Sequence, residues 1–384
     1  RRARKGPGKR GRRCAVRAGM DPTPEPLLRR LVLVLSGGVA LGAWEAGAYA
    51  ALAEAGRLPN RVVGSSAGAV AAAIIAGNPP ERRVDVLRGF WDSLAADPTP
   101  FASFLLGPPP AEGAWRRAHT AGAAVQTLFM GRPGLFRPKL MGGPETAAGP
   151  GLYDLAPLAK RLPDLVDFDL LNSRHAPDVA ICATEVETGA RVVFDTARGD
   201  VIRPEHITAS CALLPLFAPV EVEGRLLGDG GLTANTALDL AVDGPGEVTC
   251  LAVDLFGLRG SRPNGLSEGA ARAGDIVFGN QTRLQIEALR REHRLRRLLA
   301  RVSVGTPADE EVATALAEGP RTVRLALLGY RASPADAGAM KPFDFSPRTL
   351  AERWESGEAV MRAALARLGE RADVGAFVVE EVDG

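Results

Sequence analysis

The sequence predicts an α/β fold whose central sheet is mostly parallel. Residues 31–35 read Leu-Val-Leu-Val-Leu, and such a short, continuous apolar run is typical of a strand buried on both faces of a parallel sheet. A glycine-containing loop and a helical segment to about Ala55 follow, and residues 61–64 then supply a second β-branched run. This strand–helix–strand order is that of a βαβ unit, which joins parallel neighbours.

The later segments continue the same pattern. Two further helices are predicted from apolar spacing, at residues 81–96 and 347–368. Further strands are predicted where residues alternate or form short apolar runs between turn residues, at 178–186, 191–194, 220–222, 225–227, 249–255 and 323–328.

The composition is that of a globular protein. Of 384 residues, 46% are hydrophobic, and no apolar run approaches the roughly 18 to 20 residues of a membrane-spanning helix. Residues 1–20 contain nine Lys or Arg and no acidic residue, so the remainder carries 38 basic and 45 acidic residues, a formal charge of −7. This mildly acidic body argues against nucleic acid as the main partner.

The first residues of the chain differ from the rest in charge. Residues 1–17 are basic and lack the apolar region of a secretory signal. We expect residues 1–30 to form a disordered leader, with Met20 as a candidate start of the natural protein, and we expect a cytoplasmic location. The four cysteines are scattered without metal-ligand spacing, which suits reduced thiols, and neither a metal nor another cofactor is expected.

A Gly-x-Ser-x-Gly pattern spans residues 64–68, with Ser66 at its centre. A strand precedes it and a helix-forming run of small residues follows it, which is the context of a nucleophilic serine. Gly64 and Gly68 suit such a turn because a side chain at either position would collide with it. The turn places Ser66 at a helix N-terminus, where N–H groups and the helix dipole favour developing negative charge. We therefore predict that Ser66, rather than Ser65, is the nucleophile.

The loop after the first strand, residues 36–42, reads Ser-Gly-Gly-Val-Ala-Leu-Gly. Nucleotide binding fits it poorly: a valine replaces the middle glycine of the dinucleotide fingerprint, and Ala43 and Trp44 stand where a phosphate-binding loop has Lys and Ser or Thr. Backbone N–H groups of such a loop can instead stabilise the negative oxygen of a tetrahedral intermediate. We predict this oxyanion hole at three residues, Gly37, Gly38 and Val39.

A third motif, Gly228-Asp229-Gly230-Gly231, follows later in the chain. The glycine loop, the serine motif and this aspartate motif, in that order, resemble the patatin-like phospholipases over about residues 31–255. The resemblance implies a three-layer α/β/α fold and a Ser–Asp dyad in which Asp229 accepts the proton of Ser66, with Gly230 and Gly231 supporting the motif. It also implies hydrolysis of glycerolipid or phospholipid esters through an acyl-enzyme, without a metal or cofactor.

Residues 256–384 look like a bacterial branch of this family that carries a C-terminal extension. We expect a largely helical extension packed on an acyl hydrolase domain at residues 31–255. The glycine loop departs from the family pattern, because Val39 stands at the third glycine and Leu41 at a basic position. If Val39 needs a positive φ, its β-branched side chain is strained there. The alternative function is therefore a catalytically weak protein that binds lipid or a membrane through the same fold.

Two other sets of catalytic partners stay open. Asp254 lies near the end of the strand at 249–255, where ligand sites of open α/β sheets gather, but the Leu-Phe that follows lacks the glycines expected beside a serine. A Ser–Asp–His triad is the other alternative: His293 has the right order but occupies a charged helix face. The remaining histidines lie in polar stretches or beside a helix start: His119, His175 and His206. We therefore prefer the dyad with Asp229.

Two further segments suggest contact with lipid. Residues 97–151 are rich in Pro and Gly with interspersed Phe and Leu, which predicts either a mobile lid over an acyl pocket or a loop packed on the core. Residues 276–302 predict a long helix with many arginines and interleaved leucines. Such a helix suits peripheral contact with an anionic membrane, or simply a solvated helix face.

Overall fold

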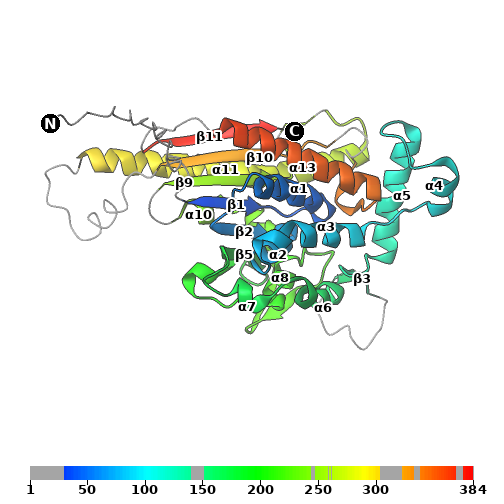
Figure 1. Ribbon diagram of the computed structural model, residues 1–384, viewed down its shortest axis with the longest axis horizontal. Coiled ribbons are helices and arrows are strands. Elements are labelled where there is room, and N and C mark those ends of the chain that lie inside the picture. The colour runs from blue at the N-terminus through cyan, green and yellow to red at the C-terminus, as the bar shows by residue number, and fades with distance from the viewer. Residues whose placement is uncertain are drawn as a thin grey trace, which may run out of the picture.

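The computed structural model describes residues 30–139, 151–243, 247–257, 259–260, 262–302, 322–332, 338–368 and 375–383. The leader at 1–29 and part of the predicted lid, 140–150, lie outside these residues. Within the described residues, nine strands form one sheet in the order β11-β10-β9-β1-β2-β5-β8-β7, with β6 paired to β5 (Figure 1). The prediction of an α/β fold with a mostly parallel sheet is confirmed.

The parallel part of the sheet has β1 (Leu31–Leu35) at its centre, between β2 (Arg61–Ser65) and β9 (Val248–Asp254). Every residue of β1 is buried, because helices cover both faces of the strand. Beyond β9 the sheet continues in parallel with β10 (Val323–Gly329) and β11 (Phe377–Asp383). The sequence predicts β10 but not β11, in which acidic residues follow the apolar ones. The C-terminal region therefore adds strands as well as helices to the fold.

The other end of the sheet is antiparallel. β5 (Asp178–Glu185) pairs in parallel with β2 and antiparallel with β6 (Arg191–Asp195). β7 (Val220–Val222) and β8 (Arg225–Asp229) form a tight hairpin, and β8 also pairs with β5. Both residues of the hairpin turn have positive φ, as the right-handed twist of the strands favours in two-residue turns. This hairpin places Asp229 at the end of a strand.

One face of the sheet packs against four helices. Alternate side chains of β1, among them Leu33 and Leu35, point into the core on this face. The helices are α1 (Gly42–Glu54), α2 (Ala67–Ala76), α3 (Arg83–Leu94) and α13 (Pro347–Arg367).

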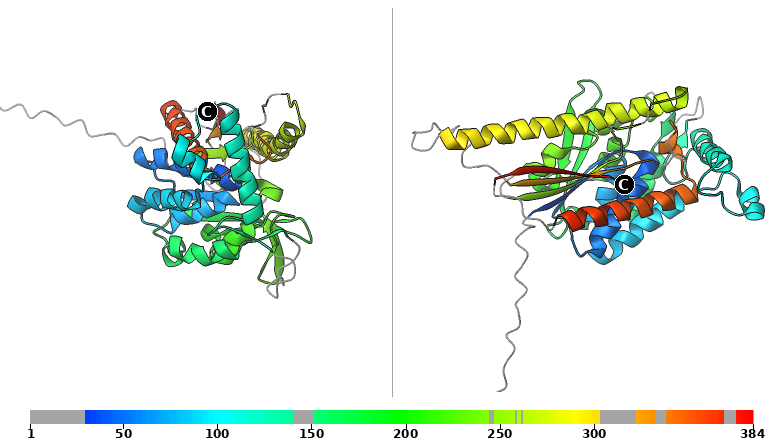
Figure 2. Two further views of the ribbon diagram at one scale, coloured as in Figure 1. Left: turned by 90° about the vertical axis from the view of Figure 1, so that its right-hand side faces the viewer. Right: turned by 90° about the horizontal axis from the view of Figure 1, so that it is seen from above.

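The opposite face packs against α10 (Leu238–Val242) and α11 (Leu266–Val302). Val32 and Val34 point to this side, where Ile286 of α11 joins them in a second apolar core. Figure 2 shows the sheet edge-on between α11 and the layer that contains α1 and α13. The three-layer α/β/α arrangement is thereby confirmed, although α11 begins earlier in the chain than predicted.

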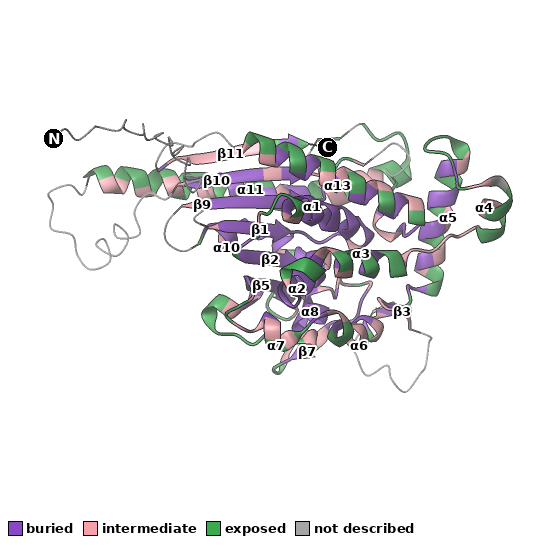
Figure 3. Cartoon of the chain, viewed as in Figure 1, coloured by how far each residue is buried: buried purple, intermediate pink, exposed green. Residues whose placement is uncertain are grey.

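The helices α1 and α13 approach each other closely at two glycines. A Cβ on Gly47 would lie 2.0 Å from the carbonyl oxygen of Trp354, and a Cβ on Gly357 would lie 2.0 Å from that of Trp44. Neither position can therefore carry a side chain while the two helices stay this close. Buried residues face this contact, whereas the outer face of α13 is exposed (Figure 3). The C-terminal helix is thus packed directly on the first helix of the chain.

The predicted lid region contains two helices, α4 (Pro100–Leu106) and α5 (Ala114–Met130). Phe101 and Phe104 of α4 are 74% and 84% exposed, whereas Phe136, after α5, is buried in the core. Some apolar residues of the region thus pack on the core and others face solvent. Movement of this region as a lid stays a prediction.

Short elements complete the described chain. They are η1 (Val39–Leu41), η2 (Pro80–Arg82), β3 (Arg137–Pro138), β4 (Tyr153–Asp154), α6 (Ala156–Leu165), α7 (Phe168–Leu171), η3 (Thr196–Arg198), α8 (Pro204–Ser210), α9 (Gly231–Ala234) and η4 (Lys341–Phe343). Among the helices of the described segments, none combines the length and the apolar character that crossing a membrane requires.

Candidate active site

Ser66 occupies a sharp turn between β2 and α2. Its backbone has φ 54° and ψ −121°, a sparsely populated conformation that costs of order 1–3 kcal/mol. A Cβ on Gly64 would lie 2.4 Å from the carbonyl oxygen of Gly68, and a Cβ on Gly68 would lie 2.3 Å from that of Leu35. The turn therefore folds only with glycine at both positions. It presents Ser66 at the first turn of α2, as the pattern of residues 64–68 predicts.

Hydrogen bonds to the main chain hold the strained turn in place. The N–H of Ser66 donates to the hydroxyl oxygen of Ser210 at 2.9 Å, and that hydroxyl donates to the carbonyl oxygen of Cys182 at 2.6 Å. The thiol of Cys211 donates to the carbonyl oxygen of Ser66 at 3.3 Å. The role of Ser210 is not predicted from the sequence, because Ser210 belongs to no motif and is notable only for lying in the segment before the aspartate motif.

The strand register explains why the serine and aspartate motifs meet. Along β5, Cys182 pairs with Ser65 of β2, and the next residue, Ala183, pairs with Asp229 of β8. Both Cys182 and Ala183 also pair with β6, which occupies the other edge of β5. β2 and β8 therefore share one edge of β5 and approach each other with their carboxyl ends. The residue that follows β2 is Ser66, so it lies beside Asp229.

Asp229 is buried beside the predicted nucleophile. Its Oδ1 accepts the N–H of Gly231 at 2.7 Å, and its carboxyl group lies close to the side chain of Ser66. Burial raises the pKa of Asp229 to about 7, although the Ser66 side chain and the Gly231 N–H act in the opposite direction. A carboxyl group with this pKa can both accept and return a proton near neutral pH. Gly230 is required for close approach, because a Cβ there would lie 2.2 Å from the carbonyl oxygen of Cys182.

The glycine loop lies against Ser66, but the N–H of Gly37, the first predicted oxyanion donor, already has a hydrogen-bond partner. The N–H of Gly37 donates to Oδ1 of Asn235 at 3.1 Å. Gly38 has an extended φ of 177°, and Val39 has φ 52°, in the left-handed region. In the described parts of the chain, no group accepts the N–H of Gly38 or Val39. The loop thus leaves two N–H groups for a ligand rather than the three that the sequence suggests.

A buried glutamate supports the start of this loop. Oε1 of Glu45 accepts the N–H of Ser36 at 2.6 Å. Burial raises the pKa of Glu45 well above its usual range, while the hydrogen bonds from Ser36 lower it. Sequence analysis misses both Glu45 and Asn235. The one available signal for Glu45 is a charged residue in an otherwise apolar helix, α1.

An apolar cavity adjoins Ser66. Its volume is about 40 Å³. Apart from Ser66, its lining is almost entirely aliphatic or aromatic, which suits a hydrocarbon chain rather than a polar headgroup. The lining residues are Val39, Ser66, Ala67, Val70, Phe90, Trp91, Leu135, Phe136, Leu155, Leu158, Cys211 and Phe217.

Asp254, the alternative aspartate, has partners away from Ser66. It is buried at the end of β9, where Oδ1 accepts the N–H of Phe256 at 3.1 Å and the side chain lies near Thr282 of α11. Burial, with a smaller contribution from the charge of Asp275, raises the pKa of Asp254 to about 7.

The histidines are placed elsewhere. Nε2 of His119 lies 3.0 Å from Asp97, and the ring of His206 stacks on Phe194 with centroids 4.0 Å apart. His293 lies against Phe377, the first residue of β11, so it is at the amino-terminal ends of the parallel strands. Ser66 follows the last residue of β2, at the opposite ends of these strands.

The basic part of α11 also lies away from the site. Its C-terminal half extends beyond the amino-terminal ends of the strands (Figure 2). Two of its arginines form ion pairs within the helix, Arg283 with Glu287 at 2.9 Å and Arg296 with Glu292 at 2.7 Å. Leu295 is 65% exposed. Contact of this helix with an anionic membrane stays a prediction. Within the described residues, no group of three His, Cys, Asp or Glu side chains is arranged to hold a metal ion.

Comparisons with solved structures give remote matches. VipD from Legionella pneumophila is 14% identical with a TM-score of 0.40, and the match covers 88% of this chain and 67% of VipD. The type III effector ExoU is 16% identical with a TM-score of 0.35, and the match covers 90% of this chain. This chain spans 53% of that ExoU chain. In a complex of ExoU with SpcU from Pseudomonas aeruginosa, the TM-score is 0.25 at 16% identity, with 90% of this chain and 75% of the other covered.

The family assignment comes from sequence models instead. No curated protein sequence matches the chain. The model described as patatin-like phospholipase matches residues 33–242, more than half of the chain, and a second model, described as patatin phospholipase (DUF3734), matches residues 276–374. The two matches cover the serine, glycine-loop and aspartate motifs and most of the C-terminal extension. The chain therefore belongs to the patatin-like phospholipase family and is a lipid acyl hydrolase.

Proposed function

We propose that the protein hydrolyses ester bonds of phospholipids or other glycerolipids through a Ser66–Asp229 dyad. The observation that carries the proposal is that these two side chains lie beside each other, where β2 and β8 meet. The raised pKa of Asp229 supports its role as a base, because a base with a pKa near 7 accepts and returns protons readily at neutral pH.

The proposed reaction has two steps. In the first, Oγ of Ser66 attacks the ester carbonyl carbon while its proton passes to the carboxylate of Asp229. The tetrahedral intermediate then collapses, and Asp229 returns the proton to the departing alcohol, which leaves an acyl-enzyme. In the second, Asp229 takes a proton from water as the water oxygen attacks the acyl carbon. Collapse releases the fatty acid, and Ser66 regains its proton.

The negative oxygen of each intermediate needs donors beside Ser66. In the proposed site, the N–H groups of Gly38 and Val39 supply them, together with the positive end of α2. Gly37 contributes by packing, since a Cβ on it would lie 2.9 Å from Cβ of Ser66. Asn235 accepts the N–H of Gly37 and thereby ties the loop to the segment after Asp229.

A fluorophosphonate probe tests the nucleophile, because it reacts only with an activated serine. We expect labelling of the wild type and of Ser65→Ala, the matched control, and none of Ser66→Ala. Wild-type protein that is folded but unlabelled would favour the alternative, a lipid-binding protein with an impaired oxyanion loop. A panel of phospholipids, lysophospholipids and neutral esters then identifies the substrate of the labelled enzyme.

A further inference from the structure

The cavity beside Ser66 is small for an acyl-binding pocket. Its volume is about 40 Å³, whereas ligand pockets usually have about 300 to 1,000 Å³. Phe90 and Trp91 of α3 form part of its wall, and their rings meet edge-on with centroids 5.2 Å apart. Both side chains are almost fully buried. A long acyl chain can extend from Ser66 in this direction only if the aromatic wall moves.

Trp91 is held from behind by a residue of the C-terminal region. The ring of Phe345 stacks on the indole, with centroids 6.5 Å apart and 25° between the planes. Phe345 is fully buried and does not line the cavity. At the start of α1, Gly42 leaves room for the indole, since a Cβ there would lie 2.8 Å from Cζ2 of Trp91. The indole N–H has no hydrogen-bond partner among the described residues, so packing alone positions the ring.

Phe345 is in turn fixed by contacts of its own. Its carbonyl oxygen accepts the N–H of Ala96, shortly after the end of α3, at 3.0 Å. The guanidinium group of Arg132 lies over its ring, 5.0 Å from the centroid. These contacts connect Phe345 to the segments on both sides of the predicted lid helices.

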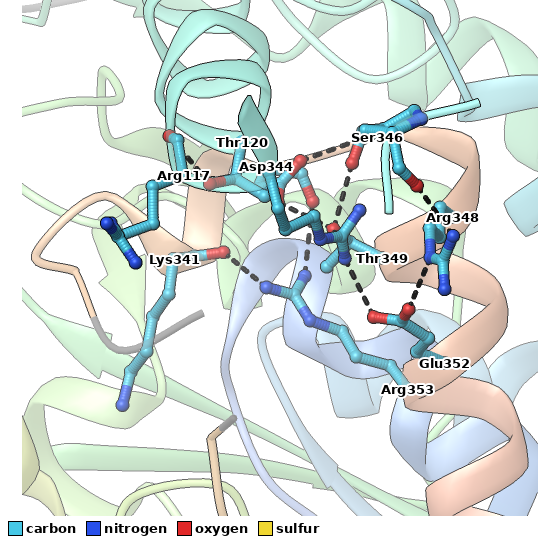
Figure 4. A network of polar contacts seen from close by, with 11 residues as sticks. Arg117, Thr120, Lys341, Asp344, Ser346, Arg348, Thr349, Glu352 and Arg353 are labelled. Atoms are coloured by element: carbon cyan, nitrogen blue, oxygen red, sulfur yellow. Dashed lines mark hydrogen bonds and ion pairs between the residues drawn. The ribbon is translucent and has the colours of Figure 1, made fainter. Parts of the chain in front are cut away.

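The residues that flank Phe345 belong to a buried polar network (Figure 4). The carboxylate of Asp344 accepts the N–H of Ser346 at 2.9 Å and the hydroxyl of Thr349 at 2.8 Å. Arg353 donates to the carbonyl oxygens of Asp344 and Lys341 at 3.2 and 2.8 Å. Buried polar groups that satisfy one another rigidify the segment that contains them. The network therefore holds the backbone of Phe345 in one place.

We infer that Phe345 determines acyl-chain specificity through Trp91, by keeping the aromatic wall closed so that the enzyme favours esters of short acyl chains. The inference rests on the proposed function, because the cavity is an acyl site only if Ser66 attacks the ester. Phe345 is a positioning residue, since it contacts the wall and not the substrate. It lies within residues 276–374, so the second family region takes part in substrate selection.

The test compares kcat/KM for p-nitrophenyl butyrate and p-nitrophenyl decanoate. We expect the wild type to prefer butyrate. Trp91→Ala opens the wall directly and should raise the decanoate-to-butyrate ratio on the order of 10- to 100-fold, the range in which apolar pockets discriminate chain length. Phe345→Ala should raise the same ratio about 3- to 10-fold, because the indole loses its support but stays present.

Phe256→Ala is the matched control. Phe256 is also a buried aromatic residue near the carboxyl ends of the strands, but it packs against Phe278 and does not line the cavity. Its removal should leave the ratio unchanged. Phe345→Leu, which keeps most of the volume, serves if Phe345→Ala does not fold, and should raise the ratio less.

Three outcomes overturn the inference. A wild type that prefers decanoate, or folded Phe345 variants with an unchanged ratio, would show that Phe345 does not set chain length, and the proposed dyad would still stand. Absence of Ser66-dependent hydrolysis in the wild type would remove the proposed function and this inference with it.

Discussion

Asp229 and Asp254 end two strands of the same sheet and have similar electrostatics. Both are buried, and burial raises the pKa of each to about 7. Their contacts differ. Asp229 lies beside Ser66, whereas Asp254 accepts the N–H of Phe256 and lies near Thr282. Burial thus raises the pKa of a carboxyl group to a similar value at the proposed catalytic position and at a position remote from Ser66. Proximity to the predicted nucleophile, and not the pKa, separates the two.

Strand pairing is the origin of this difference. β8 shares an edge of β5 with β2 and approaches it with its carboxyl end, so Asp229 lies beside the turn that carries Ser66. β9 is separated from β2 by β1. Since neighbouring strands lie about 4.8 Å apart, the end of β9 is about 10 Å from that of β2. That separation is too long for direct proton transfer from Ser66 to Asp254.

The largest expected effect is the difference in activity between variants of Asp229 and variants of Asp254. Ser66→Ala and Asp229→Asn should each lower kcat/KM for a lipid ester by about 10⁴-fold or more, and the double variant should lose little beyond either, because the two groups act as a unit. Asp254→Asn should keep activity within about tenfold of the wild type, because no reacting atom contacts it. A large loss in Asp254→Asn with retained activity in Asp229→Asn would reverse the assignment.

The next largest effect is expected at Val39, which lies in the glycine loop beside Ser66. Its φ of 52° strains a β-branched residue. Glycine has no such strain, so Val39→Gly should place the N–H better and raise kcat. The increase in kcat should not exceed roughly 10²- to 10³-fold, which is the contribution of one oxyanion-hole donor to kcat. Val39→Ala keeps the Cβ and serves as the control. Unchanged turnover in Val39→Gly would mean that the valine already holds its N–H correctly.

The two aspartates should differ in what their ionisation changes: that of Asp229 should change activity, and that of Asp254 should change stability. Asp229 must be ionised to accept a proton, so kcat/KM should rise with pH to a plateau above about 7. Asp254 should affect stability instead. Its folded-state pKa of about 7 exceeds the usual 3.8, so its stabilisation is complete below pH 3.8 and is lost as pH rises to about 7.

Denaturant unfolding across this range measures that contribution. The free energy of unfolding of the wild type should fall between pH 4 and pH 7 more steeply than that of Asp254→Asn, whose kcat/KM profile should match the wild type. Ionisation of Glu45 and Asp229 contributes to the fall in both proteins, because burial also raises their pKa values. Identical slopes for the two proteins would show that Asp254 does not titrate as described.

The smallest effect concerns a region remote from both aspartates. We propose that the basic face of α11 between residues 290 and 301 binds anionic vesicles. Reversing the charge of Arg294 and Arg297 in a chain that begins at Met20 should reduce co-sedimentation and leave hydrolysis of soluble esters unchanged. Binding should weaken with salt, because charges beyond about 8 to 10 Å are screened. Equal binding at low and high salt would exclude this attraction.

Local patterns in the sequence determine much of this protein. The apolar run of β1, the glycines around Ser66 and the aspartate motif each reflect a rule that acts over a few residues, namely burial on two faces, steric collision in a tight turn, and close approach of two backbones. They suffice to predict the α/β fold and the turn that carries Ser66, whereas the pairing of Ser66 with Asp229 comes from the resemblance to patatin-like phospholipases. β11 is not predicted, because it is an edge strand whose acidic residues weaken the apolar pattern.

Only the tertiary structure decides how these local units meet. The pairing of Ser65 and Asp229 with consecutive residues of β5 brings two distant motifs into contact. The same holds for Asn235, which engages the N–H of Gly37, and for Phe345, which supports Trp91. Each of these contacts joins residues that are far apart in the chain. Strand register and helix packing set such contacts, and both depend on the summed burial of the whole core rather than on any short stretch of sequence.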